Sequence, residues 1–461
     1  MSLGKISGGI RLEKELVEMI NQREAKIAII GLGYVGLPTA ALFANLGFRV
    51  TGVDVNSKII NQINQGEVQT KEIGLREIVA KACKQGYLSA TEKYVAVNEA
   101  NIVIISVQTP LDNRGNANLS FLEAACQAIA EHMRRNKLII VQSTIPPKTI
   151  ETLIVPTLEN RSKLKCGKDF WLIFCPERMT PGNGLNDLTE NSRLIGAYDP
   201  ASAALGRALF QLVTKGKLIL TDIPSAEMAK LAENTFRYVN IAFANELALL
   251  CKQIDVDVLE VISLANTHPR VNIHTPGSGA GGPCLSKDTH LLLNSTKSNN
   301  FKSKVISAAI KINNYMPRHI AELALDALNG TGKDVKNSRI AVFGTAYKAD
   351  VSDSRDSPSK GIVQELRKNG AQIVIFDPNC DESFGETKAK NIKEALTGAD
   401  CIILAVDHKV FCKLDLYTIK SLMKENPVIV DAKRIINPAE AKKLGFKYSA
   451  PSWPSADQRC C

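Results

Sequence analysis

Residues 26–54 read KIAIIGLGYVGLPTAALFANLGFRVTGVD, and this stretch indicates the fold. A β-branched run ends at Gly31, a helical pattern begins near Gly36, and a second apolar run ends at Asp54. In a strand–turn–helix unit Gly31 permits a tight turn, Gly33 lets the backbone approach a pyrophosphate, and Gly36 allows close helix-to-strand packing. We therefore predict a dinucleotide-binding turn, with the pyrophosphate on amide groups at the helix N-terminus.

The carboxylate of Asp54 indicates which dinucleotide this turn would bind. Asp54 follows Gly36 by 18 residues (54 − 36) at the end of the second apolar run. There it would accept hydrogen bonds from both hydroxyls of the adenine ribose and repel a 2′-phosphate, which favours NAD over NADP. The alternative is that the glycines serve packing alone. The predicted cofactor-binding residues of this turn are Gly31, Gly33, Tyr34, Val35, Gly36 and Asp54.

The rest of the chain repeats the alternation of strand and helix patterns. Short β-branched runs alternate with helical patterns from Lys26 to about Leu220, and again from Arg339 onward. This predicts an α/β fold with two Rossmann-like, doubly wound parallel-sheet domains. A helical stretch of roughly 30 residues without Gly or Pro lies between them and is expected to join the domains or form a subunit interface. The predicted division is 1–220, 221–329 and 330–461, with Gly330–Asn337 as the linker.

Composition restricts the class of protein. The 461 residues are 45% hydrophobic and 23% charged, without a membrane-length apolar stretch or a secretory leader pattern, so we expect a cytoplasmic protein. Eleven cysteines without a CxxC pair or a Cys/His cluster suit a reducing compartment and predict no metal site. The final Cys460-Cys461 is interpreted as a frayed terminus rather than a lipidation signal. A net charge of +10 suits small polyanions, and 5% aromatics without a basic run disfavour nucleic acid.

Polar side chains follow several of the predicted strands. Thr109 follows NIVIISV, Ser143 and Thr144 follow LIIVQ, and Glu177 follows FWLIFCP. Each one alone could be a helix cap. Because ligands of parallel sheets gather at the carboxyl ends of the strands, together these side chains outline a cleft.

Cys284 differs from the other cysteines, most of which sit in apolar patterns. It lies in GSGAGGPCLSKD (277–288), where the glycines would let the backbone approach a ligand and Lys287 would favour a thiolate. A nucleophilic cysteine beside a dinucleotide site suggests aldehyde oxidation through a thiohemiacetal and a thioester. Lys230 and Asn234 are four residues apart on one helix face, where they could stabilise an oxyanion. Without Cys284, that pair would be expected to face solvent.

The order of the motifs extends these inferences to a known family. GLGYVG, VQTPLD, STIPP, CPERMTPG, AEMAKLAENTFR, AFANE, NTHPRVNI, GAGGPCLSKD and AYKADVSDSRDSPS follow one another over nearly the whole chain. In these motifs the chain resembles the nucleotide-sugar 6-dehydrogenases, which include UDP-glucose and UDP-N-acetylhexosamine dehydrogenases. The resemblance implies an NAD-binding domain, a central helical dimerisation segment, and a C-terminal domain for the nucleotide of the sugar donor. It also implies a homodimer or higher homo-oligomer that oxidises a 6-hydroxymethyl group to a carboxylate with two NAD molecules, supplying a uronic acid for polysaccharide biosynthesis.

The resemblance assigns roles to particular residues. It implies Cys284 as nucleophile, Lys230 and Asn234 as oxyanion stabilisers, and Asp288 as an aid to proton transfer. Thr144 and Glu177 would position water and sugar. The remaining implied contacts are Arg270 and Lys348 with the nucleotide sugar, Arg270 extending toward the partner subunit's site, and Thr109, Thr144, Lys287 and Arg355 with NAD.

Departures from the family pattern bear on the sugar. The UDP-glucose enzymes typically carry PEFLRE, whereas this chain has PERMTPG with Arg178 after Glu177, similar to the N-acetylhexosamine enzymes. We therefore predict a UDP-N-acetylhexosamine substrate with Arg178 as a sugar contact, and UDP-glucose as the alternative. Leu285-Ser286 replaces a common proline near the lysine, and the family's C-terminal arginine could be Lys433 or Arg434. The rival classes are a non-catalytic nucleotide-binding protein and a two-electron hydroxyacid dehydrogenase.

Overall fold

The protein divides into two compact units. The computed structural model describes residues 3–70, 72–295 and 301–451, so Cys460 and Cys461 lie outside the described residues. The first unit runs to Glu233 and takes in His290–Ser295, and the second comprises Asn234–Thr289 and the rest of the chain. Helix α10 (Ile223–Gln253), the long helix expected from the sequence, has 31 residues and contributes to both units. Within the described ranges no helix is long and apolar enough to cross a membrane.

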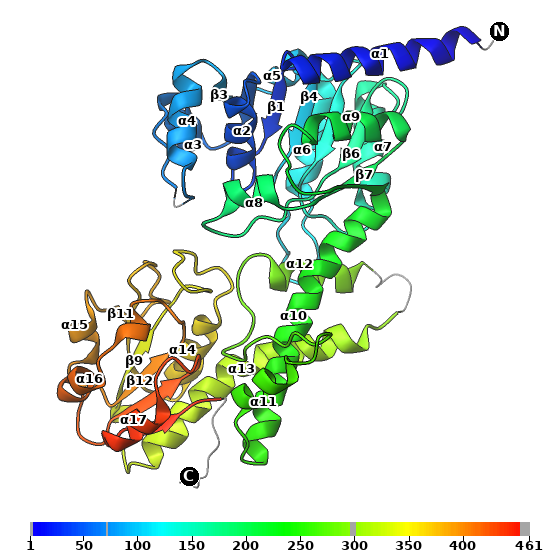
Figure 1. Ribbon diagram of the computed structural model, residues 1–461. Coiled ribbons are helices and arrows are strands. Elements are labelled where there is room, and N and C mark those ends of the chain that lie inside the picture. The colour runs from blue at the N-terminus through cyan, green and yellow to red at the C-terminus, as the bar shows by residue number, and fades with distance from the viewer. Residues whose placement is uncertain (1–2, 71, 296–300, 452–461) are drawn as a thin grey trace. The chain divides into compact units, whose positions relative to one another are not determined.

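The first unit is built on an eight-stranded sheet (Figure 1). Its strand order, 3-2-1-4-5-6-7-8, contains the order 3-2-1-4-5-6 that is typical of dinucleotide-binding folds. The order in which successive strands are added along the sheet reverses between β1 and β4, and these two strands are themselves parallel. In that order the strands are β3 (Leu88–Thr91), β2 (Val50–Val53), β1 (Ile27–Ile30), β4 (Ile102–Ile105), β5 (Leu138–Val141), β6 (Trp171–Phe174), β7 (Arg193–Ala197) and β8 (Leu218–Asp222).

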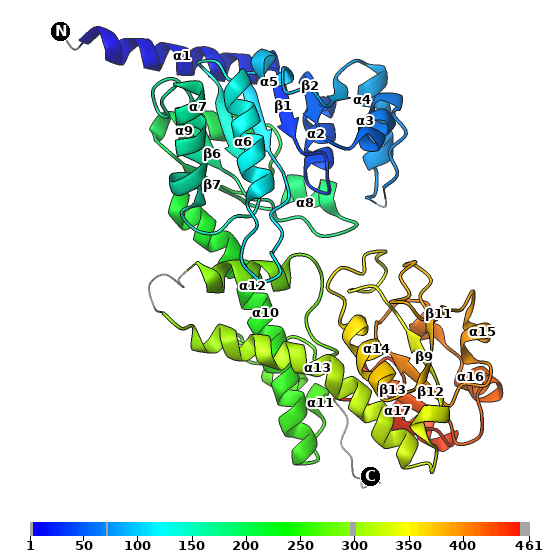
Figure 2. The ribbon, with the colours of Figure 1, turned by 180° about the vertical axis from the view of Figure 1, so that it is seen from behind.

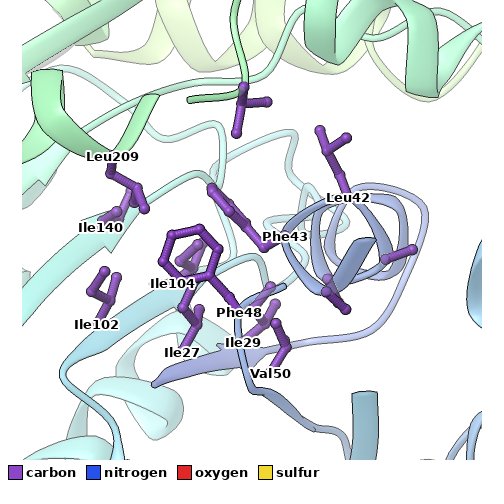
Figure 3. Packing of buried hydrophobic residues seen from close by; sticks show 14 of the residues in the cluster. Ile27, Ile29, Leu42, Phe43, Phe48, Val50, Ile102, Ile104, Ile140 and Leu209 are labelled. Carbon is purple, nitrogen blue, oxygen red and sulfur yellow. The ribbon is translucent and has the colours of Figure 1, made fainter. Parts of the chain in front are cut away.

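Helices cover both faces of this sheet (Figures 1 and 2). Strand residues alternate between the faces, so Ile27 and Ile29 of β1 join one core while Ala28 and Ile30 join the other. Phe43 and Phe48 fill the first core, with ring centroids 5.8 Å apart at right angles, against the isoleucines of β1 and β4 (Figure 3). The helical segments are α1 (Leu3–Gln22), α2 (Gly36–Asn45), α3 (Ser57–Gln65), α4 (Leu75–Lys84), α5 (Ala96–Glu99), α6 (Ser120–His132), the π-helical turn η1 (Ile150–Ile154), α7 (Val155–Ser162), α8 (Gly184–Glu190) and α9 (Pro200–Phe210).

One part of this sheet differs from the sequence-based expectation of parallel strands. β6 and β7 pair antiparallel, with Phe174 opposite Gly196, and β8 runs parallel to β7. The connection between β6 and β7 contains only the short helix α8, which makes no crossover along the sheet. The chain therefore re-enters the sheet at the edge where β6 ends, which an antiparallel neighbour allows.

The second unit contains a six-stranded sheet whose pairs are all parallel. Together the two sheets confirm the prediction of two Rossmann-like domains. The strands, in spatial order, are β11 (Thr387–Lys388), β10 (Gln372–Phe376), β9 (Arg339–Phe343), β12 (Cys401–Leu404), β13 (Val428–Asp431) and β14 (Lys447–Ser449). The helical segments are α11 (Val258–Ala265), α12 (Leu285–Asn294), α13 (Lys304–Asn329), η3 (Val335–Asn337), α14 (Pro358–Lys368), α15 (Ile392–Leu396), η4 (Phe411–Lys413), α16 (Leu416–Leu422) and α17 (Pro438–Lys443).

The core of the second sheet begins before the expected linker. Ile320, Ala324 and Leu328 of α13 pack with Ile340 and Val342 of β9 on one face of the sheet. The other face packs against α16, α17 and η4. The expected linker is thus a short connection, partly the turn η3, between a helix and a strand of the same core.

Candidate active site

The turn after β1 requires glycine at two of its three motif positions. Gly31 has φ of +91°, and a Cβ there would lie 2.6 Å from the Ser106 carbonyl oxygen. A Cβ on Gly36 would lie 1.8 Å from the Gly31 oxygen, so no larger residue fits. Gly33 meets nothing within 4 Å. Gly31 and Gly36 therefore form the turn, and Gly33 leaves open space where a ligand could approach the backbone.

The start of α2 and Asp54 complete this turn. Val35 is the N-cap of α2 and no side chain caps the helix, while Tyr34 is exposed. Uncapped amides at a helix N-terminus favour an anion. The Asp54 carboxylate accepts from Leu32 N at 2.7 Å and from Asn56 N at 2.9 Å. Each oxygen keeps further acceptor capacity, because a carboxylate has about four lone-pair sites.

Two loops at the carboxyl edge of this sheet are hydrogen-bonded to each other. Thr109, which follows β4, donates its hydroxyl to the Thr144 carbonyl oxygen at 2.6 Å. Ser143, which follows β5, donates in the opposite direction to the Val107 carbonyl oxygen at 2.7 Å. The loops that carry the two predicted cofactor contacts, Thr109 and Thr144, are thus held side by side.

A buried carboxylate on α10 holds the loop that contains Thr144. Glu227 is fully buried and accepts from Lys148 N at 2.6 Å and Ile150 N at 3.1 Å. Burial raises the pKa of Glu227 to about 7, although the two backbone N–H groups lower it. The carboxylate satisfies amides that would otherwise be unpaired where the helical segment η1 begins.

One turn further along α10, Lys230 holds the loop after β6. Its buried ammonium donates to the Glu177 carbonyl oxygen at 2.7 Å and lies 3.5 Å from Glu177 Oε1. The other carboxylate oxygen of Glu177 accepts from Met179 N at 2.6 Å. Lys230 and Glu177, predicted separately as catalytic groups, therefore lie in contact.

The side chain of Arg178 forms hydrogen bonds and an ion pair within the protein. Its guanidinium donates to the Ser192 carbonyl oxygen at 2.7 Å and forms an ion pair with both carboxylate oxygens of Glu233. The predicted sugar contact of Arg178 stays a prediction, and the structure gives this side chain a second task, which is to hold its own loop against α10.

In the second unit, the glycines before Cys284 contact the protein's own residues. A Cβ would lie 2.6 Å from the Asn313 oxygen at Gly279 and 2.6 Å from the Tyr347 ring at Gly282. Gly281 would meet Pro358 at the same distance. The contacts show that these glycines let the loop pack against α13, α14 and the loop after β9, and the approach of a ligand to this backbone stays a prediction. Cys284 itself is exposed.

Asn234, Cys284, Lys287 and Asp288 come together at the start of α12. Asn234 of α10 donates its amide to Asp288 Oδ2 at 2.6 Å. Asp288 N donates to the Cys284 carbonyl oxygen at 2.8 Å, and Lys287 Nζ lies 2.7 Å from Asp288 Oδ1. The Asp288 carboxylate is buried, and its negative charge is stabilised by the hydrogen bond from Asn234 and by the neighbouring ammonium of Lys287.

The remaining predicted contacts are spread over the second unit. Arg270, after α11, and Lys348, after β9, are exposed. Arg355 pairs with Asp353 at 2.6 Å, and this hydrogen-bonded partner raises the pKa of Arg355. Lys433 and Arg434, the two candidates for the family's C-terminal arginine, lie in different environments. Lys433 Nζ lies beside the loop before Cys284, 2.9 Å from the position that a Cβ would take on Gly277. Arg434 forms an ion pair with Asp257 at 3.1 Å.

The chain matches domain models of a single protein family. Three models match: the NAD binding domain at residues 25–214, the central domain at 224–315 and the UDP binding domain at 341–438, all of the UDP-glucose/GDP-mannose dehydrogenase family. The chain belongs to this family. As a UDP-glucose/GDP-mannose dehydrogenase family member it is an NAD-dependent nucleotide-sugar dehydrogenase, which confirms the prediction of its class and cofactor.

Individual relatives align with this chain over most of its length and most of their own. The UDP-N-acetyl-D-mannosamine dehydrogenase of Methanococcus maripaludis strain C7 is 39% identical over 92% of this chain and 96% of its own. The structure of the UDP-D-ManNAc dehydrogenase of Pyrococcus horikoshii is 39% identical, with a TM-score of 0.87 over 93% of this chain and 99% of its own. A UDP-glucose dehydrogenase structure from Pyrobaculum islandicum is 29% identical, with a TM-score of 0.84 over 93% and 98%.

The first unit of this dehydrogenase fits NAD. The open space at Gly33, the uncapped start of α2 and the partly exposed Asp54 are the features that a pyrophosphate and an adenine ribose require. When bound, NAD supplies the hydride acceptor. No group of three or more His, Cys, Asp or Glu side chains in the described ranges could hold a metal ion.

The sequence did not predict a role for two residues near this site, Glu227 and Glu233. Glu227 and Glu233 lie three residues before and after Lys230, so helical spacing places all three near one face. This spacing is the one feature of the sequence that could have indicated their role. It is not sufficient, because a glutamate on a helix usually faces solvent. Their function as loop anchors is visible only in the contacts with the loops after β5 and β6.

Asp54→Ala should raise the Michaelis constant for NAD about tenfold or more, because a charged acceptor for the ribose is lost. It should also narrow the preference for NAD over NADP. Steady-state kinetics with both cofactors measure this, with Asp199→Ala, which removes a helix N-cap in the same unit, as the control. An unchanged ratio of the two specificity constants would show that the ribose is read elsewhere.

Glu227→Gln should remove a pH dependence of stability. In the wild type the pKa of Glu227 is about 7 in the folded protein, above the ordinary value of 4.5. Between these two pH values the folded protein holds a proton on Glu227 that the unfolded chain has released. This stabilisation is complete below about pH 4.5 and is lost as pH rises through 7. The free energy of unfolding of the wild type, relative to the variant, should fall by about 1–3 kcal/mol between pH 5 and 8.

Denaturation at the two pH values measures this difference. Glu190→Gln, which removes an exposed carboxylate paired with Lys215, is the control and should show no such trend. A constant difference between wild type and Glu227→Gln would mean that Glu227 ionises normally in the folded protein.

Proposed function

We propose that this dehydrogenase oxidises C6 of UDP-N-acetyl-D-mannosamine to the carboxylate, with two NAD reduced per sugar. The observation that carries the reaction is the exposed Cys284 at the start of α12, beside the Asn234–Asp288 pair. The sugar is supported by relatives of that name at 39–40% identity, which cover most of both chains. UDP-glucose is the alternative, because a UDP-glucose dehydrogenase structure also resembles this chain, at 29% identity.

The proposed chemistry has two oxidations and one hydrolysis. The 6-hydroxymethyl group loses a hydride and a proton to become an aldehyde, and the Cys284 sulfur adds to the aldehyde carbon to give a thiohemiacetal. Loss of a second hydride and proton leaves a thioester, and water releases the uronate and restores the thiol. The balance is one alcohol, two NAD and one water to one carboxylate, two NADH and three protons. Covalent attachment retains the intermediate while the first NADH is exchanged.

Lys230 and Asn234 are proposed to stabilise the oxyanions that form at C6. An ammonium has three donors, so Lys230 can hold Glu177 and still donate to a substrate oxygen. Asn234 donates one amide hydrogen to Asp288 and has another available on the same nitrogen. Asp288 would assist proton transfer, while Thr144 and Glu177 would position water and sugar.

The second unit would supply the nucleotide site and the subunit contact. Arg270 and Lys348 are proposed to bind the nucleotide sugar. Phe236, Phe243 and Leu250 recur every seven residues along α10 and are 66%, 48% and 57% exposed. Exposed apolar side chains at that spacing support association of two copies through this helix. We infer a homodimer, in the cytoplasm where NAD and nucleotide sugars are supplied, producing a uronic acid for polysaccharide biosynthesis.

A panel of UDP-sugars tests the substrate. We expect two NADH for each UDP-N-acetyl-D-mannosamine consumed, with a specificity constant at least roughly tenfold above that for UDP-glucose, since each unpaired buried partner costs about 1–3 kcal/mol. NADH absorbance and chromatography of the product measure both quantities. One NADH with a free aldehyde would refute the four-electron reaction, and equal turnover of UDP-glucose would favour the alternative sugar.

Cys284→Ser should nearly abolish turnover while NAD binding survives, because a serine hydroxyl is a poorer nucleophile and its ester is slower to hydrolyse here. Cys412→Ser is the matched control, since Cys412 is also an exposed cysteine in the second unit and has no proposed role. Turnover by Cys284→Ser at a tenth or more of the wild-type rate would assign the nucleophile to another residue.

A further inference from the structure

The turn after β9 in the second unit repeats the backbone of the turn after β1. Gly344 has φ of +99° and donates to the Phe376 carbonyl oxygen at 2.9 Å. Gly31 has φ of +91° and donates to the Val53 carbonyl oxygen at 2.8 Å. In each sheet the accepting strand is the immediate neighbour, β10 or β2, and is followed directly by an aspartate.

The two aspartates differ in what remains available for a ligand. Asp54 is partly exposed and accepts two backbone hydrogen bonds. The side chain of Asp377 is fully buried. The groups that donate to Asp377 are Thr345 N at 2.7 Å, Ala346 N at 3.0 Å, the Thr345 hydroxyl at 3.3 Å, Asn379 N at 2.8 Å, Cys380 N at 2.9 Å and His408 Nε2 at 3.1 Å.

These contacts saturate Asp377. Burial alone would raise the pKa of Asp377, but the hydrogen bonds from His408 and the backbone lower it well below its usual range, so the group is a carboxylate. A carboxylate has about four lone-pair sites, and all are occupied by the protein. Asp377 therefore has no capacity to read a ribose in the way expected of Asp54.

The neighbours of His408 indicate which of its two ring nitrogens carries the hydrogen. Asp350 N lies 2.9 Å from Nδ1, and a backbone N–H can only donate, so Nδ1 accepts. The Asn379 amide nitrogen is 3.1 Å from the same atom. Nε2 then carries the hydrogen that is donated to Asp377. The ring is completely buried, so its loss would leave the buried end of the loop, at Asp350 N, without its acceptor.

The loop Thr345–Asp350 is held at both ends by this pair of side chains. Asp377 accepts from the first two amides of the loop, and His408 accepts from the last. Lys348 lies between the two attachments and is exposed.

We propose that His408 is a positioning residue that fixes the Thr345–Asp350 loop so that Lys348 meets the nucleotide of the sugar donor. This rests on the proposed function, in which Lys348 contacts that nucleotide. One consequence follows. The nucleotide is bound through the loop and not by the Asp377 carboxylate.

Titration calorimetry with UDP, on the full-length protein, tests the positioning role. His408→Gln keeps a donor for Asp377 but has no acceptor opposite Asp350 N, so the dissociation constant for UDP should rise at least about fivefold. His408→Asn, whose side-chain oxygen can replace Nδ1, should recover much of the affinity. NAD should bind both variants with the affinity that it has for the wild type.

Asp415→Ala is the control for general destabilisation, because it removes the N-cap of α16 in the same sheet domain without touching the loop. Unchanged UDP affinity in folded His408→Gln, or an equal loss in Asp415→Ala, would overturn the proposal. If His408→Gln does not fold, Asn379→Ala removes one donor to Nδ1. A rise of at least twofold in its UDP dissociation constant supports the proposal, and no change overturns it.

Failure of the proposed function has a different signature. If the wild type binds UDP but releases no NADH with UDP-sugars, the reaction is wrong and the calorimetric comparison of the variants still decides the role of His408. If the wild type does not bind UDP, the nucleotide assignment and the positioning role are both refuted.

Discussion

The first turns of α10 contribute three ionisable side chains to the carboxyl edge of the first sheet. Glu227 holds the loop after β5, Lys230 holds the backbone after Glu177, and Glu233 holds Arg178. Loops at a sheet edge have no ladder of their own to fix them, so the positions of Thr144 and Glu177 depend on these contacts. Because all three anchors are on one rigid helix, the two loops are held in a fixed relation to each other.

Local patterns in the sequence were sufficient for the dinucleotide turn and for most of the strands. The glycine spacing, the strand before it and Asp54 all lie within 29 residues (26–54), where backbone geometry follows directly from residue type. The strands β3, β11 and β14 were not anticipated, because LSAT, TK and KYS lack an apolar run. Long-range pairing decides such edge strands, and no local pattern reports it.

The candidate site was predictable in its residue types and less so in its contacts. Cys284, Asn234 and Asp288 were singled out, and the structure brings them together at α12. That Glu177 and Lys230 are paired, and that the glycines before Cys284 pack against Tyr347 and Asn313, depends on segments distant in sequence. Which group donates to which acceptor is set by the tertiary fold, and sequence spacing carries no record of it.

The two anchors of the loop after β6 differ in their exposure to dissolved ions. The side chains of Lys230 and Glu177 are 6% and 11% exposed, whereas those of Arg178 and Glu233 are 28% and 36% exposed. At physiological ionic strength mobile ions screen exposed charges beyond about 8 Å and weaken accessible pairs, while they reach buried ones far less. Rising salt therefore weakens the Arg178–Glu233 ion pair before the Lys230–Glu177 contact, so one of two neighbouring attachments of this loop to α10 is sensitive to salt and the other is protected.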